Sequence, residues 1–397
     1  MKKEFEIKDG LRTAKHVDDV NMTGKEKLID QYVKIVEDVF GECKVSKHNF
    51  TCIGVRHQKL PNGDVSLDQD EYIKTMRPIV SPELTGAPPS AKATKHVSDQ
   101  FVSLRGALAY TALTQAWIIV YIVSFQRVQE PTNLDVRRLN AVVRKLQKEP
   151  KHLIFPAMTP TNEVDLHSDS GYRRETGDKE DEVKGYGMRG LNLLRRGIDR
   201  NKKPRVHLLE SICKSHRLKV RSSYGAETLA AAHGLDDAFS SLVTLHELTF
   251  GVLKPHQLMK VREEGGLKIR TTLTTDAESL YKSLSSRDLK TPTEKTLLGH
   301  VSWIREMMQN GIVDEIQWCD TRDMTADGHT KGSIDRKQLL EVMQGYQAFQ
   351  YPVKKYKPHR TGNGSAKPSG NAGSLQESLP PRKYTTLQTY AEFLGLS

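Results

Sequence analysis

The stretch LKIRTTLTTDAESLYKSL, residues 267–284, joins a strand to a helix through an acidic residue. Leu267, Ile269 and Leu273 alternate with polar residues, which predicts a strand. Asp276 follows at the polar junction, where the spacing of apolar residues changes to that of a helix. Because strand followed by helix is the repeating unit of α/β domains, this stretch indicates the fold class of the surrounding segment.

Three other stretches between residues 162 and 349 place an acidic residue where a strand ends or a helix begins. In each, two apolar residues alternate with polar ones and predict the strand. The stretches are EVDLHSDSGY (163–172), with Val164, Leu166 and Asp169; HRLKVRSSYGAETLAAA (216–232), with Leu218, Val220 and Glu227; and IQWCDTRDMTADGHTKG (316–332), with Ile316, Trp318 and Asp327. Thr325 is a candidate cap for the helical turn that carries Asp327.

One acidic residue at a helix start has an ordinary structural explanation, because Asp and Glu cap helices and favour the positive end of the helix dipole. Four such residues in one α/β domain suggest more, since strand ends of one sheet converge in space. Converging carboxylates repel one another unless cations hold them, and two-metal nucleases use such clusters to position water and stabilise the leaving oxygen. The pattern predicts a site for Mg²⁺ or Mn²⁺.

The segment from about 162 to 349 resembles the ribonuclease H domain of copia-type LTR retrotransposons. The motifs that carry the resemblance are RSSYGAET (221–228), TTDAESLY (274–281) and TADGHTKG (325–332), and the last, with its Ala-Asp-x-x-Thr-Lys pattern, is the strongest. The resemblance implies a mixed five-stranded sheet with helices and endonucleolytic cleavage of the RNA strand in RNA–DNA hybrids. It also makes the catalytic metal ligands Asp169, Glu227, Asp276 and Asp327.

Two positions depart from the family. The polar run DKEDEVKG (178–185) stands where the family usually has a hairpin, so Asp165 remains an alternative to Asp169 as the first ligand. His329 stands where the family commonly has Leu. We expect a solvent-exposed histidine at the start of a helix there, and the functional alternative is a group that steers protons or product.

The N-terminal block resembles the end of a reverse-transcriptase palm and thumb. KHVDDVNMTG (15–24) is similar to the paired-aspartate turn, with Asp18 and Asp19 in the metal-binding positions and His16 where an aromatic is more usual. The roughly fifteen residues before Asp18 cannot supply fingers and an earlier palm strand at the known rise per residue. We therefore expect both aspartates to be relics of a polymerase site. A polymerase would need its missing parts from a partner in trans.

Apolar periodicity predicts a helix over 28–40, strands over 50–58 and 64–68, a buried helix over 106–124 and a helix over 134–147. The predicted fold class is α/β and α+β. The predicted parts are a partial palm and thumb (1–80), a linker (81–99), a helical connection (100–150), a ribonuclease H-like domain (151–350) and a disordered basic tail (351–397).

Composition narrows the class of protein. Lys and Arg outnumber Asp and Glu by 60 to 49, and the net charge of +11 favours nucleic acid as a partner. The four cysteines form no CxxC pair and the first residues lack a secretory signal, so we expect an intracellular protein, cytoplasmic or nuclear. Polar residues interrupt the apolar stretch 106–124, so no membrane partner is expected. The alternatives to a nuclease are a non-catalytic nucleic-acid-binding remnant and an interaction scaffold.

Overall fold

In the computed structural model of this chain, residues 11–16, 19–171, 187–216, 218, 220–288 and 292–358 are described. The polar run 178–185, Asp18, and the side chains of His16 and Asp19 lie outside this description. The same holds for the basic tail after residue 358. The predictions made for those residues remain predictions.

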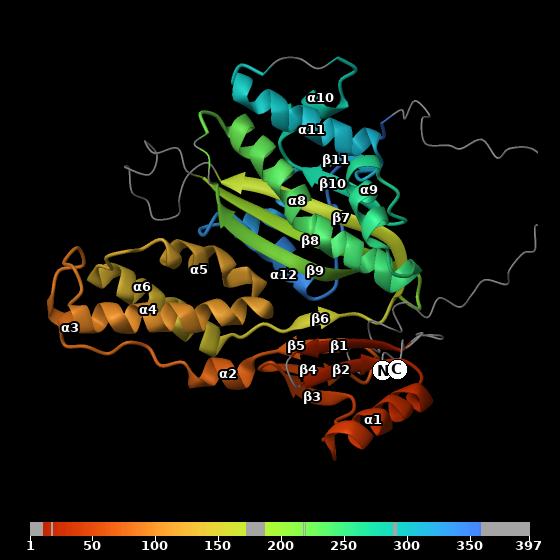
Figure 1. Cartoon of the computed structure of the whole chain (residues 1–397). Helices are drawn as coiled ribbons and strands as arrows, with labels where there is room; N and C mark the ends of the chain where they lie inside the picture. The colour runs from red at the N-terminus through yellow and green to blue at the C-terminus, as the bar shows by residue number, and fades with distance from the viewer. Residues whose placement is uncertain are drawn as a thin grey trace, which may run out of the picture.

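Two small sheets and one helix form the N-terminal part (Figure 1). They comprise β1 (Arg12–His16) paired with β2 (Asp19–Thr23), α1 (Glu26–Phe40), and the antiparallel sheet β3 (Asn49–Cys52), β4 (Val55–Lys59), β5 (Val65–Asp68) and β6 (Leu153–Phe155). The predicted helix is confirmed. The single strand expected over 50–58 is wrong, because Ile53 and Gly54 adopt positive φ angles of 48° and 64° and turn the chain into a hairpin.

A helical layer follows, made of α2 (Asp70–Thr75), α3 (Glu83–Gly86), α4 (Lys95–Tyr110), η1 (Thr111–Leu113), η2 (Ala116–Ile118), α5 (Ile119–Gln126) and α6 (Asn133–Lys148). The single helix expected over 106–124 is wrong. The chain bends at Thr114 and Gln115, whose buried side chains bond outside the helix: Thr114 Oγ1 donates to Gln69 Oε1 at 3.0 Å. None of the described helices has both the length and the apolar character that crossing a membrane requires.

The larger sheet has the order β12-β11-β10-β7-β8-β9. Its strands are β7 (Thr159–Gly171), β8 (Met188–Ile198), β9 (Pro204–Ser215), β10 (Arg270–Thr275), β11 (Glu315–Trp318) and β12 (Lys354–Tyr356). Strands β7, β8 and β9 run antiparallel, whereas β10 is parallel to both β7 and β11. This mixed sheet with helices confirms the expected α/β class and the expected mixed sheet. The sixth strand, β12, lies within the segment expected to be a disordered tail and pairs with β11.

One face of this sheet is covered by α8 (Ser223–Phe250), α10 (Glu278–Ser285) and α11 (Leu298–Gln309) (Figure 1). The elements α9 (Pro255–Glu264) and η3 (Lys295–Leu297) pack against α8. Gly234 lets α8 approach closely, since a Cβ there would lie 2.8 Å from Leu191 Cδ1. The described residues Leu218 and Val220 lie in no strand, in contrast to the prediction. Strand β9 ends at Ser215, and Ser222 caps α8 by accepting a hydrogen bond from the Gly225 N–H at 3.0 Å.

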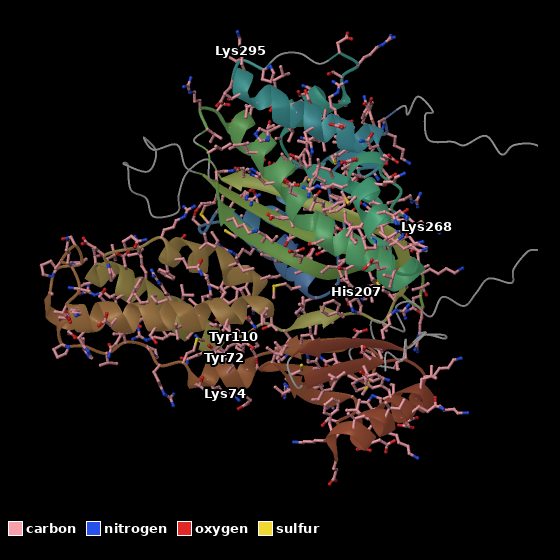
Figure 2. The ribbon with its side chains drawn as sticks, viewed as in Figure 1. Tyr72, Lys74, Tyr110, His207, Lys268 and Lys295 are labelled. Carbon is pink, nitrogen blue, oxygen red and sulfur yellow. The ribbon has the colours of Figure 1, made fainter. Side chains whose placement is uncertain are left out.

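The opposite face is covered by α12 (Lys337–Met343) and by the helical layer. One apolar core unites Phe101 of α4 and Leu139 of α6 with Leu208 of β9 and Met343 of α12. His207 of β9, labelled in Figure 2, donates through Nε2 to the Pro156 carbonyl at 2.9 Å, just beyond β6. The helices and the larger sheet therefore share a core. The strand β6, which precedes β7 in the chain, joins the larger sheet to the four-stranded N-terminal sheet.

Candidate metal centre

Three of the predicted acidic residues meet at one edge of the larger sheet. Oxygens of Asp169, Glu227 and Asp276 all lie within 4.8 Å of one another. The three residues come from the end of β7, the second turn of α8 and the residue after β10. Thr274 pairs with His167 in the parallel register, so Asp276 continues beside Asp169. Parallel strands that end at the same edge thus bring together residues far apart in sequence.

The carboxylates of this group contain oxygens that are buried and unpaired. Asp169 is 1% exposed and Glu227 is 9% exposed. Asp169 Oδ1 and Glu227 Oε2 have no hydrogen-bond partner in the described part of the chain. Burying a carboxylate oxygen without a donor is costly, and a hard divalent cation takes such oxygens as ligands. The donor set therefore fits Mg²⁺ or Mn²⁺.

The remaining oxygens are oriented by the protein. The Ser170 N–H donates to Glu227 Oε1 at 3.3 Å, and Thr321 Oγ1 donates to Asp276 Oδ2 at 2.8 Å. The Thr330 hydroxyl donates to Asp169 Oδ2. Each carboxylate is thus held by one donor, which fixes its direction while leaving its second oxygen for an ion.

The electrostatics of this group favour binding of a cation. Burial, followed by repulsion from Asp327, raises the pKa of Asp169 to about 7. Burial and repulsion from Asp169 raise the pKa of Asp276 to about 6 and place that of Glu227 well above its usual range. A bound cation would favour the ionised forms and reverse these shifts.

Asp327 lies beside this group rather than in it. It belongs to η5 (Thr325–His329), which packs closely on β8 because Gly190 makes room: a Cβ there would lie 2.8 Å from the Ala326 carbonyl oxygen. The Asp327 carboxylate is buried next to Asp169 and forms an ion pair with Lys331. Three of the four predicted ligands therefore share one point, and the fourth lies next to Asp169 and is paired to a lysine.

Thr325 does not cap this turn. Met324 occupies the cap position, and Thr325 Oγ1 accepts a hydrogen bond from Asn192 Nδ2 at 3.2 Å. Thr330 and Lys331, which contact the carboxylates, were not predicted as site residues. Their signal was present in TADGHTKG, because a lysine four residues after an aspartate in a helical turn can reach it.

Asp165, the alternative first ligand, lies elsewhere on β7. It is fully buried and forms an ion pair with Arg196, with Nε 2.6 Å from Oδ2. Asp169 lies four residues further along the strand, a distance of about 13 Å at the usual rise per residue. The geometry therefore favours Asp169.

The expectation of a surface histidine at position 329 is wrong. His329 is fully buried, and its Nε2 donates to Asn192 Oδ1 at 2.7 Å. Burial lowers the pKa of His329 to about 3, so the ring stays neutral. Its hydrogen bond fastens η5 to β8 and thereby supports the position of Asp327.

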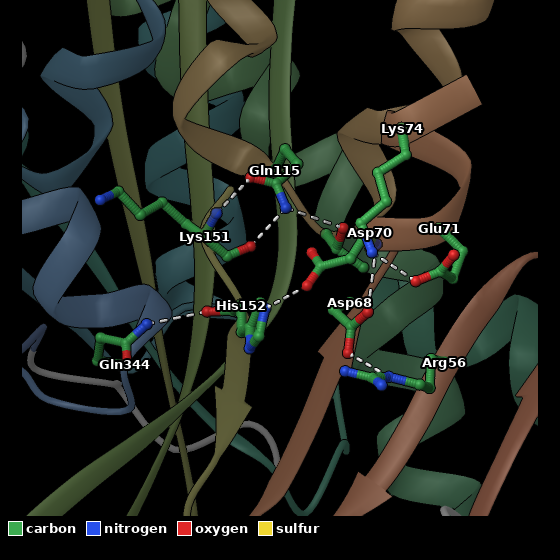
Figure 3. Close-up of polar contacts among 10 residues, drawn as sticks. Arg56, Asp68, Asp70, Glu71, Lys74, Gln115, Lys151, His152 and Gln344 are labelled. Carbon is green, nitrogen blue, oxygen red and sulfur yellow. Dashed lines mark hydrogen bonds and ion pairs between the residues drawn. The ribbon is translucent and has the colours of Figure 1, made fainter. Parts of the chain in front are cut away.

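A second acidic group has a structural explanation. Asp68, Asp70 and His152 also offer atoms within 4.8 Å of one another. Figure 3 shows them in a network in which Arg56 Nε lies 2.9 Å from Asp68 Oδ2 and His152 Nε2 lies 3.0 Å from Asp70 Oδ2. These ion pairs, together with the nearby hydrogen bond from Gln344 to the His152 carbonyl, join the four-stranded sheet to the rest of the molecule.

No protein-family model and no curated protein matches this chain. Several solved structures overlap with it. The RNase H domain of rv2228c from Mycobacterium tuberculosis, fused to maltose binding protein, is 15% identical over 42% of this chain and 90% of that one, with a TM-score of 0.26. RNase H1 from Halobacterium salinarum is 12% identical over 45% of this chain and 97% of that one, with a TM-score of 0.25.

A third overlap is with a foamy viral protease-reverse transcriptase in complex with an RNA/DNA hybrid. It is 9% identical over 74% of this chain and 34% of that one, with a TM-score of 0.36. These overlaps assign no role to any residue, so the chemistry of the site has to come from its own side chains.

Proposed function

We propose that this protein is a metal-dependent endonuclease that hydrolyses the RNA strand of RNA–DNA hybrids. The observation that carries the proposal is the convergence of Asp169, Glu227 and Asp276 at the edge of a mixed sheet, with a buried, unpaired oxygen on each of Asp169 and Glu227. The motifs shared with copia-type ribonuclease H support it and suggest that the chain derives from such a retrotransposon. Its Asp18 and Asp19 remain relics of the polymerase in this proposal.

Asp169, Glu227 and Asp276 would hold the ion. When bound, it would supply Lewis acidity and a water of lowered pKa for phosphodiester hydrolysis. Thr321, Thr330 and the Ser170 amide keep the carboxylates aimed at one point, so the protein does not reorganise when the ion or substrate arrives. Lys331 adds positive charge at the same edge, where a substrate phosphate would approach.

Substrate recognition would depend on charge and on the ribose. The net charge of +11 favours a polyanion without choosing between DNA and RNA. Discrimination for RNA would come from contacts to the 2′-hydroxyl and to the groove shape of the hybrid. A non-catalytic binding remnant would need only the charge, and it would not need three oriented carboxylates.

The test is cleavage of an end-labelled RNA–DNA hybrid by the full chain, beside DNA duplex and RNA duplex of the same sequence. We expect cleavage of the RNA strand in the hybrid alone, in Mg²⁺ or Mn²⁺, and none in EDTA. Binding to all three duplexes, measured in parallel, serves as the control. Binding without cleavage in either metal would contradict the proposal and favour the remnant.

A further inference from the structure

Lys331 contacts two of the clustered carboxylates, those of Asp169 and Asp327. Its ammonium forms an ion pair with Asp327 and lies 3.9 Å from Asp169 Oδ2. The side chain is 35% exposed, so the charge is half-buried. The ammonium therefore places a positive charge between the carboxylates of Asp169 and Asp327.

These contacts divide the four acidic residues into two sets that share Asp169. Asp169, Glu227 and Asp276 surround one point that has unpaired oxygens. Asp169 and Asp327 flank a second point, which the Lys331 ammonium fills. In a site with two divalent ions, which lie about 3.5–4 Å apart, the second ion would also need carboxylate ligands. The ammonium thus lies between Asp169 and Asp327, the two carboxylates that would have to hold such an ion.

We propose that Lys331 occupies the place of the second cation, so that the protein without nucleic acid binds one divalent ion rather than two. This inference rests on the proposed function, because it concerns the same metal centre. One divalent ion and one ammonium supply three positive charges against four carboxylates. A second divalent ion would have to displace the ammonium and would be repelled by it at short range. Lys331 is then a positioning residue, and Asp327 acts on the site through it.

The experiment counts Mn²⁺ ions bound by the full chain, using equilibrium dialysis and the electron paramagnetic resonance of Mn²⁺. We expect about one ion in the wild type and about two in Lys331→Met. The spectrum of Lys331→Met should also show broadened lines, because two Mn²⁺ ions in a two-metal site lie about 3.5–4 Å apart. Lys331→Arg keeps the charge and should keep one ion. Lys337→Met is the matched control, because Lys337 is 61% exposed and pairs only loosely with Glu341, at 3.8 Å.

Asp327→Asn gives a second measurement if Lys331→Met does not fold. Under the proposal Asp327 is no ligand of the first ion, so the variant should still bind one Mn²⁺, whereas Asp276→Asn should weaken that binding at least about tenfold. A wild type that binds two ions, a Lys331→Met that folds and binds one, or an Asp327→Asn that binds none would overturn the inference. Hybrid cleavage by the wild type alongside such a result would leave the proposed function standing. A wild type that binds no Mn²⁺ would overturn both.

Discussion

Thr274 pairs with His167 across the parallel strands β10 and β7, and this register sets Asp276 beside Asp169. The two carboxylates are 107 residues apart in sequence, yet they lie side by side because their neighbouring strands end at the same edge of the sheet. A shift of the register would move Asp276 along the strand direction and out of the group of three. The strand pairing, rather than either residue alone, therefore creates the centre.

Asp276→Asn should abolish hybrid cleavage and leave hybrid binding and folding intact. Asn keeps the size of the side chain and can still accept the hydrogen bond from Thr321, but it loses the charge that an ion requires. The measurements are cleavage in Mg²⁺ and Mn²⁺, hybrid affinity and circular dichroism. If Asp276 only initiates the helix that follows, a folded Asp276→Asn will cleave like the wild type.

The same variant should be more stable than the wild type in the absence of metal at neutral pH. The folded-state pKa of Asp276 is raised to about 6, so the folded protein binds more protons than the unfolded chain between about pH 4 and 6. Ionised Asp276 therefore costs stability as pH rises through this window. Because the residue is partly exposed, we expect a gain of about 1–2 kcal/mol for Asp276→Asn at pH 8.

This gain should disappear near pH 4, where wild-type Asp276 is protonated. Urea unfolding in EDTA at pH 4.5 and pH 8 measures it. Comparing the variant with the wild type cancels the contribution of the buried histidines, which remain in both proteins. A gain of equal size at both pH values would mean that charge is not the cause.

Local periodicity was enough to predict the junctions at Asp169 and Asp276, because each lies at or just after the end of a strand whose alternation is visible in consecutive side chains. It could not predict the pairing of β6 with β5, since all the helices of the helical layer lie between these two strands in the sequence. It also placed His329 at the surface, because the Asn192 partner that makes burial tolerable comes from a distant strand. The role of Lys331 depends on Asp169, another long-range contact. What sequence reasoning missed was thus set by tertiary contacts.

A fragment that begins at residue 151 should fold poorly. It would expose Leu208 and Met343, which pack against the helical layer, and would leave β6 without its partner β5. Exposed apolar patches of this kind promote aggregation. Size-exclusion chromatography and thermal unfolding should show an aggregated or strongly destabilised fragment beside a monodisperse full chain. Equal stability of the two would establish the predicted helical connection as a separate domain.

Full-length variants test the same shared core without truncation. Leu139→Ala removes a fully buried side chain and should cost about 2–5 kcal/mol, with the whole protein unfolding in one transition. Leu113→Ala, at a position that is 55% exposed, is the matched control and should cost less than about 0.5 kcal/mol. Two separate transitions in Leu139→Ala would argue against a common core.

Arg196→Met should destabilise the protein without affecting metal binding, which separates Asp165 from the metal centre. Asp165 is fully buried, and burial raises its pKa to about 6 even though Arg196 opposes the shift. Removing the guanidinium leaves a buried, uncompensated carboxylate, which costs about 3–5 kcal/mol. The cost should shrink below about pH 6, because Asp165 can then be protonated and needs no counter-charge.

Adding Asp165→Asn to Arg196→Met should recover much of the lost stability at neutral pH. Urea unfolding from pH 5 to 8 and Mn²⁺ binding are the measurements; if Arg196→Met or Asp165→Asn abolishes Mn²⁺ binding in a folded protein, Asp165 and not Asp169 is the ligand on β7.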